Sequence, residues 1–81
     1  MAGRKSHYGA NRTMILRLIS ATAKSHGAPP TVRELASMLG VGVATMHLYL
    51  NRLSDEGLLV REPGRHRSLR MTDAGRDVLG A

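Results

Sequence analysis

Cysteine is absent from the 81-residue chain. This absence excludes disulfide frameworks, thiolate zinc sites and cysteine nucleophiles. No apolar run approaches the ~18–20 residues of a membrane span. The basic start of the chain leads into Ser6-His7-Tyr8-Gly9, which is not an apolar stretch, so we expect no secretory signal. Together these absences favour a cytoplasmic protein.

Acidic residues are few, because six Asp and Glu stand against twelve Lys and Arg. The formal net charge is +6 and the isoelectric point is about 11.2. A domain of this size buries roughly 60–65% of the surface that its unfolded chain exposes, enough for one core but not for an additional deep cavity. The composition therefore favours a polyanionic partner and gives no reason to expect a small-molecule effector.

Most of the positive charge lies in two short segments that contain glycine. Residues 1–9 carry Arg4 and Lys5 and no acid, and residues 61–70 carry four arginines against Glu62. The remainder of the chain is nearly neutral. Charge placed in this way is typical of arms and loops that bind phosphates.

The first predicted helix follows Asn11, a residue of N-cap type, and ends at Gly27, after which Pro29-Pro30 prevents continuation. An apolar stripe at helical spacing supports it. The stripe consists of Ile15, Leu18, Ile19, Thr22 and Ala23. We therefore divide the chain into a basic flexible arm (1–10), a folded domain (11–72) and a short C-terminal helix with its tail (73–81).

A second helix is predicted at residues 32–39, because Thr31 and Glu34 have the spacing of a capping box. The turn at Gly40–Gly42 follows, and then a third helix at residues 43–56. Its predicted buried face consists of Met46, Tyr49, Leu50 and Leu53. A short helix, a tight turn and a longer helix form a helix-turn-helix, whose second member enters the DNA major groove.

The last third of the sequence predicts a β-hairpin and a fourth helix. Residues 58–61 and 67–71 have strand composition, and Pro63-Gly64 between them favours a turn. Thr72 is a suitable cap for a helix at 73–79.

Three segments carry a resemblance to known families. Gly40-Val41-Gly42-Val43-Ala44-Thr45-Met46, with Gly57-Leu58-Leu59, resembles the core pattern of winged helix-turn-helix regulators of bacteria and phages. Residues 28–36 are similar to the N-terminal DNA-binding domain of LexA repressors, and residues 71–76 resemble the segment that follows the wing in MarR-like and PadR-like regulators. The resemblance implies a mainly α fold with a small β-hairpin, that is, a three-helix bundle with a wing and a short C-terminal helix.

Two departures from the pattern stand out. Gly42 occupies the place of the serine that usually caps the recognition helix. The turn before the third helix is one residue shorter than in LexA, which favours a generic winged helix over LexA proper.

The resemblance implies sequence-specific binding of double-stranded DNA by a small, nucleoid-associated transcriptional repressor or regulator, with a possible homodimer on two-fold sites. Asn51 can pair bidentately with adenine, and His47 can donate to guanine or phosphate. Leu48 and Ala44 can contact a thymine methyl group. The full candidate set is Thr31, Arg33, Val43, Ala44, Thr45, His47, Leu48, Asn51 and Arg52 in the helices, Arg65, His66 and Arg67 in the wing, and Arg4 and Lys5 in the arm.

Functions other than DNA binding are also compatible with a winged helix. A winged helix can instead serve as a protein-interaction module, or as an adaptor in DNA partition, replication or packaging, using an apolar patch at Val43 and Leu48. The four histidines lack the spacing of a ligand pair, so we expect no metal and no cofactor. The Ala74-Gly75 pair is similar to the bond cleaved in LexA-type repressors, but no set of side chains supports catalysis, and we predict a protein that is not an enzyme.

Overall fold

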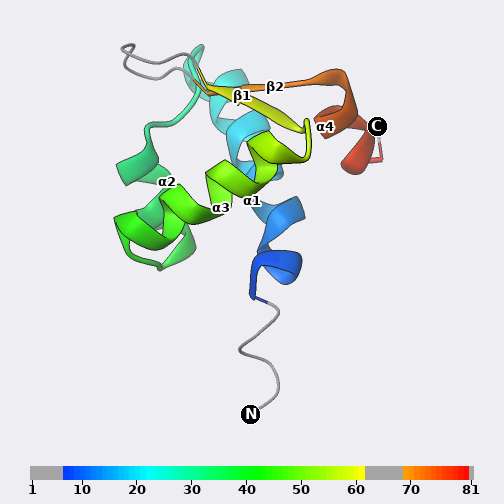
Figure 1. Cartoon of the computed structure of the whole chain (residues 1–81). Coiled ribbons are helices and arrows are strands. Elements are labelled where there is room, and N and C mark those ends of the chain that lie inside the picture. The colour runs from blue at the N-terminus through cyan, green and yellow to red at the C-terminus, as the bar shows by residue number, and fades with distance from the viewer. Residues whose placement is uncertain (1–6, 62–68, 81) are drawn as a thin grey trace.

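The computed structural model describes residues 7–61 and 69–80, with side chains from residue 11 onward. Helices α1, α2 and α3 form a bundle, the β1–β2 hairpin crosses one end of it, and α4 follows the hairpin (Figure 1). This arrangement confirms the predicted mainly helical winged helix-turn-helix. The elements are α1 (His7–His26), α2 (Val32–Leu39), α3 (Val43–Asp55), β1 (Leu59–Arg61), β2 (Leu69–Met71) and α4 (Asp73–Val78).

Helix α1 begins at His7, five residues before Arg12, the first helical residue predicted after Asn11. The predicted arm at residues 1–10 is therefore partly helical. A residue of cap type permits a helix to begin but does not force it to, and residues 7–10 contain no proline that would stop the helix from extending. The other end is as predicted, because Gly27 has φ 76° and its N–H donates to the Ala23 carbonyl over 2.9 Å.

The buried face of α1 is wider than the predicted stripe. Ile15 and Ile19 are buried, and Leu18 packs against the core, but Leu16 is fully buried as well. The reason is that α1 contacts α2, α3, α4 and β2, so two neighbouring sides of the helix are covered. The core is made of Ile15, Leu16, Ile19, Leu35, Ala36, Met46, Leu50, Leu53, Leu58, Leu59 and Leu69.

The capping box at the start of α2 is formed as predicted. The Glu34 N–H donates to Thr31 Oγ1 over 3.1 Å, and the Thr31 N–H donates to Glu34 Oε1 over 2.9 Å. Two backbone groups that lack partners inside the helix are thereby satisfied.

Replacing Thr31 by alanine should therefore lower the free energy of unfolding by about 1 kcal/mol, because the N–H of Glu34 loses its acceptor. Urea unfolding measures this change. The Thr31→Ser variant keeps the acceptor oxygen and should retain most of the stability; equal losses in the two variants would contradict the capping explanation.

The turn of the helix-turn-helix depends on Gly40, which has φ 76° and lies in the left-handed region. Its N–H and that of Val41 both donate to the Ala36 carbonyl, over 2.9 and 3.0 Å. Gly42 then caps α3 with extended backbone and no side-chain hydrogen bond. Ala36 in α2 is only 3% exposed. Its small side chain allows α2 and α3, which contact each other, to pack closely.

Helix α3 ends in a Schellman motif around Gly57, whose φ is 77°. The Leu58 N–H donates to the Leu53 carbonyl and the Gly57 N–H donates to the Ser54 carbonyl, both over 3.0 Å. Leu58 therefore belongs to the helix cap, and β1 begins one residue later than predicted.

The hairpin is antiparallel and pairs Leu59 with Met71, Val60 with Arg70, and Arg61 with Leu69. Along β1, Leu59 is buried, Val60 is exposed and Arg61 is half-buried. Because strand side chains alternate between faces, Leu59 and Arg61 share the face that meets the helices. Among the helices of the described residues, none has an apolar stretch of the length that crossing a bilayer requires.

Candidate nucleic-acid interface

Helix α3 divides into an inner and an outer face. Met46, Leu50 and Leu53 are fully buried and attach the helix to the core, as their spacing predicts. Tyr49, the remaining residue of the predicted inner face, is half-buried. The outer residues of the candidate set are Val43, Ala44, His47, Leu48, Asn51 and Arg52, all exposed, with Thr45 half-buried at the edge.

Four of these outer residues form a compact group, which we call the reading face: Ala44, His47, Leu48 and Asn51. Their spacing of three and four residues places them side by side on one side of a helix. Leu48 is 64% exposed, and Val43, five residues before it at the start of α3, is 40% exposed. Large apolar side chains with this much exposure indicate a contact surface when they lie among polar neighbours.

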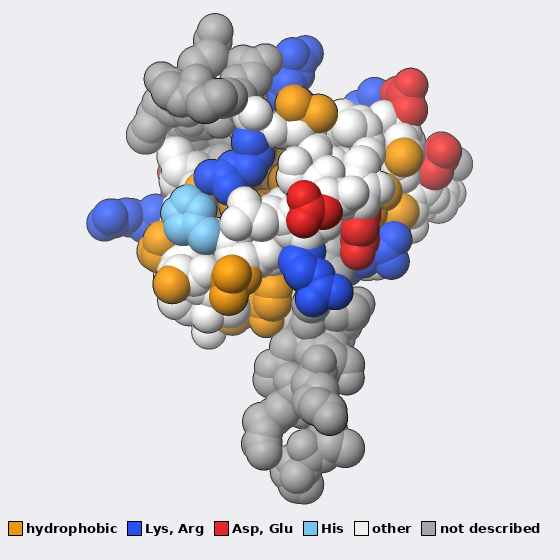
Figure 2. Space-filling view, viewed as in Figure 1, with side chains coloured by type: hydrophobic (Ala, Val, Ile, Leu, Met, Phe, Trp, Pro, Cys, Tyr) orange, Lys and Arg blue, Asp and Glu red, His pale blue; other side chains and the backbone are white. Residues whose placement is uncertain are grey.

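Charge is distributed unevenly around this face. The candidate residues of α3 include no acid, and the acidic pair Asp55 and Glu56 lies at the C-terminal end of the helix. Figure 2 shows a histidine with basic and hydrophobic side chains at the left of the molecule, while the acidic side chains lie from its middle to its right, where further basic side chains lie beside them. The described surface around the reading face therefore favours a negatively charged partner.

Arg61 at the end of β1 joins two residues of the reading face. Its Nη1 donates to Asn51 Oδ1 over 3.2 Å, and its Nη2 lies 3.4 Å from His47 Nδ1. The candidate set omitted Arg61. The alternation of side chains along β1 indicates that Arg61 faces the helices, as Leu59 does. Its contacts with Asn51 and His47 span 10 and 14 residues of sequence, so no short sequence pattern predicts them.

Two further candidates, Thr31 and Arg33, lie at the start of α2. The Oγ1 and backbone N–H of Thr31 are both engaged in the capping box, so this N–H is not available to a phosphate. Arg33 is exposed on the first turn of the same helix. The candidates Arg4, Lys5, Arg65, His66 and Arg67 lie outside the described residues.

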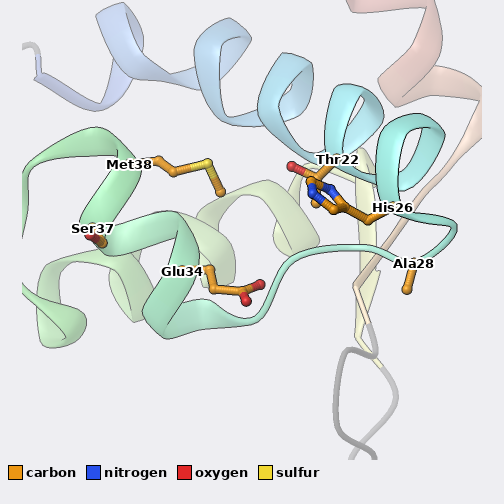
Figure 3. Close-up of a pocket in the computed structure, with 6 residues that line it drawn as sticks. All are labelled: Thr22, His26, Ala28, Glu34, Ser37 and Met38. Carbon is orange, nitrogen blue, oxygen red and sulfur yellow. The ribbon is translucent and has the colours of Figure 1, made fainter.

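A hollow of about 500 Å³ lies between α1 and α2. Its lining comes from these helices and the loop that joins them, and includes none of the candidate residues (Figure 3). Met38 and the polar side chains of His26 and Glu34 border it. The hollow and the reading face therefore have no residue in common.

Comparison with known proteins adds independent information. Residues 9–68 match the family model described as the LexA DNA binding domain. The chain is 39% identical over 67 residues to the LexA repressor of Limosilactobacillus reuteri, and 40% identical over 67 residues to those of Limosilactobacillus fermentum and Lacticaseibacillus casei. Each match covers 82% of this chain and 32% of the relative. The chain therefore spans about a third of the length of these relatives.

Proposed function

Because this chain belongs to the LexA DNA-binding domain family, we propose that it binds a specific sequence of double-stranded DNA through helix α3. The helix enters the major groove with Ala44, His47, Leu48 and Asn51 against the base edges. The observation that carries this proposal is the outer face of α3 from Val43 to Arg52, which is exposed and carries no acid, while the opposite face is anchored in the core.

Affinity and sequence preference come from different residues in this proposal. The arginines and lysine near the face and in the two basic segments neutralise phosphates, which provides most of the affinity and makes it dependent on salt. The reading face is nearly uncharged, so it discriminates between bases by hydrogen bonds and apolar contacts.

We further propose that the DNA-bound chain acts as a bacterial repressor in the cytoplasm, where it blocks transcription by occupying its site. Two copies on a two-fold site would match the common geometry of helix-turn-helix proteins. The symmetry of the preferred sequence, determined by selection from a random duplex library, tests this dimer.

Replacing Asn51 by alanine should weaken binding to the preferred duplex by at least about 1 kcal/mol and relax the base preference at one position. Mobility-shift titration against the preferred and a scrambled duplex measures both effects. Arg17→Ala is the matched control, because Arg17 is exposed on α1 and has no place in the proposed interface. If both variants lost the same affinity on both duplexes, Asn51 would have no role in base recognition.

Arg65→Ala should weaken binding to all sequences about equally and reduce the slope of log affinity against log salt by about one. The same titration at two salt concentrations gives this slope. Binding of the unaltered chain that does not depend on salt would remove the DNA proposal and favour a protein partner for the apolar side chains of Val43 and Leu48.

A further inference from the structure

The contacts of Arg61 constrain the orientation of both polar residues on the reading face. A guanidinium group carries only N–H donors and has no acceptor. The atom of Asn51 that faces Arg61 must therefore be the amide oxygen, and it lies 3.2 Å from Nη1. By the same reasoning, His47 Nδ1, 3.4 Å from Nη2, accepts only when it is unprotonated, which places the ring hydrogen of the neutral imidazole on Nε2.

These orientations give the reading face a defined hydrogen-bonding character. With Oδ1 held by Arg61, the Nδ2 amide group of Asn51 remains available to donate. With Nδ1 held by Arg61, the Nε2–H of His47 also remains available to donate. Both free groups are therefore donors. The two residues lie one helical turn apart on an exposed face, so these donors lie side by side.

We propose that Arg61 is a positioning residue that directs this face toward guanine by fixing Asn51 and His47 as donors. Guanine offers two acceptors, N7 and O6, on its major-groove edge, whereas adenine offers N7 beside the N6 donor. The inference rests on the proposed function, because it specifies which base that function recognises.

The proposal changes the interpretation that the sequence alone suggests for Asn51. A bidentate contact with adenine requires Oδ1 to accept from the N6 group while Nδ2 donates to N7. In this structure Oδ1 already accepts a charge-assisted hydrogen bond from Arg61. For adenine, the N6 group would have to share Oδ1 with the guanidinium by using its second lone pair. A guanine edge instead offers two acceptors to the two free donors, so guanine is the better match.

Two variants separate positioning from charge. Arg61→Ala removes both hydrogen bonds and frees the Asn51 amide to turn. Arg61→Lys keeps the positive charge but presents a single nitrogen, which cannot reproduce the two-armed contact of a guanidinium. Arg17→Ala removes one positive charge from an exposed site on α1 and controls for the loss of charge alone.

The experiment is selection from a random duplex library, followed by titration of duplexes that differ only at the position read by Asn51. That position is identified as the one where Asn51→Ala loses its preference. The unaltered chain should prefer guanine there. Arg61→Ala should reduce the ratio of guanine to adenine affinity by roughly tenfold, the lower part of the range for a bidentate contact. Arg61→Lys should also reduce the ratio, but with an unchanged salt slope, whereas Arg17→Ala should leave the ratio as it is.

The outcomes distinguish this inference from the function on which it rests. If the unaltered chain binds all duplexes equally, the proposed function fails. If the chain selects a sequence but prefers adenine at the Asn51 position, or if Arg61→Ala selects the same base with the same ratio, only the role of Arg61 is refuted. Thermal unfolding of the variants shows whether the β1 end has kept its structure. A change in base ratio at unchanged melting temperature supports positioning, because a purely structural loss lowers affinity for all duplexes together.

Discussion

Leu16→Ala should lower the free energy of unfolding by about 2–5 kcal/mol, although the stripe of α1 that its sequence suggests does not include this residue. Leu16 is 0% exposed and belongs to the central cluster of apolar side chains. The truncation removes the burial of three carbon atoms and leaves a cavity between α1 and its neighbours. For a domain of this length each 1 kcal/mol corresponds to about 4–8 °C, so the melting temperature should fall by at least about 8 °C.

Leu48→Ala is the matched control for this variant. It makes the same chemical change on a side chain that is 64% exposed. Its effect on unfolding should stay within about 0.5 kcal/mol, while its affinity for the preferred duplex should fall. If Leu48→Ala were as destabilising as Leu16→Ala, the assignment of Leu48 to a free surface would be wrong.

The local elements could be predicted because their signals are local. The capping box of Thr31 and Glu34, the left-handed Gly40 and the spacing of Met46, Leu50 and Leu53 each act within a few residues. The start of α1 differs from the prediction because no local signal marks it. No proline lies between His7 and Asn11 to end the helix there. The apolar pattern marks only the part of a helix that packs against the core, so it does not indicate how far α1 extends beyond that part.

Contacts between distant segments mark the limit of prediction from the sequence. The outward position of His47 and Asn51 follows from the helical period, but their link to Arg61 depends on where the hairpin crosses α3. The burial of Leu16 likewise depends on which elements cover α1. Periodicity shows which face is apolar and does not show how many neighbours that face has.

Turn length proved to be a weak guide to the family. The length of the turn before α3 favours a winged helix other than LexA proper, yet the LexA domain match covers residues 9–68, which include this turn. Gly40 and Val41 close the end of α2 on a single carbonyl, that of Ala36. A turn closed in this way leads from the end of α2 at Leu39 into α3 at Val43 through only three residues, 40–42.

Gly75→Ser should destabilise the protein by about 2–3 kcal/mol, even though serine favours a helix over glycine by roughly half a kcal/mol. Gly75 is buried in α4, and an added Cβ would lie 2.6 Å from Met71 Cγ and closer still to the Leu58 carbonyl oxygen. The methionine side chain can move aside. The carbonyl cannot move at low cost, because it accepts the Thr72 N–H over 3.1 Å and follows the Schellman motif of α3.

Gly42→Ser provides the same substitution with the opposite expected sign. Gly42 has φ −73° and ψ 160°, and nothing lies within 4 Å of a Cβ added there. The new hydroxyl can accept a backbone N–H from the first turn of α3, which should stabilise the protein by a few tenths of a kcal/mol. Urea unfolding of both variants tests the pair. An unchanged stability of Gly75→Ser would show that α4 does not pack against Leu58 as closely as described, and a loss at Gly42 would contradict the expected cap. A loss of stability in Gly75→Ser together with a gain in Gly42→Ser would show that α4 can pack against Leu58 only because residue 75 has no side chain.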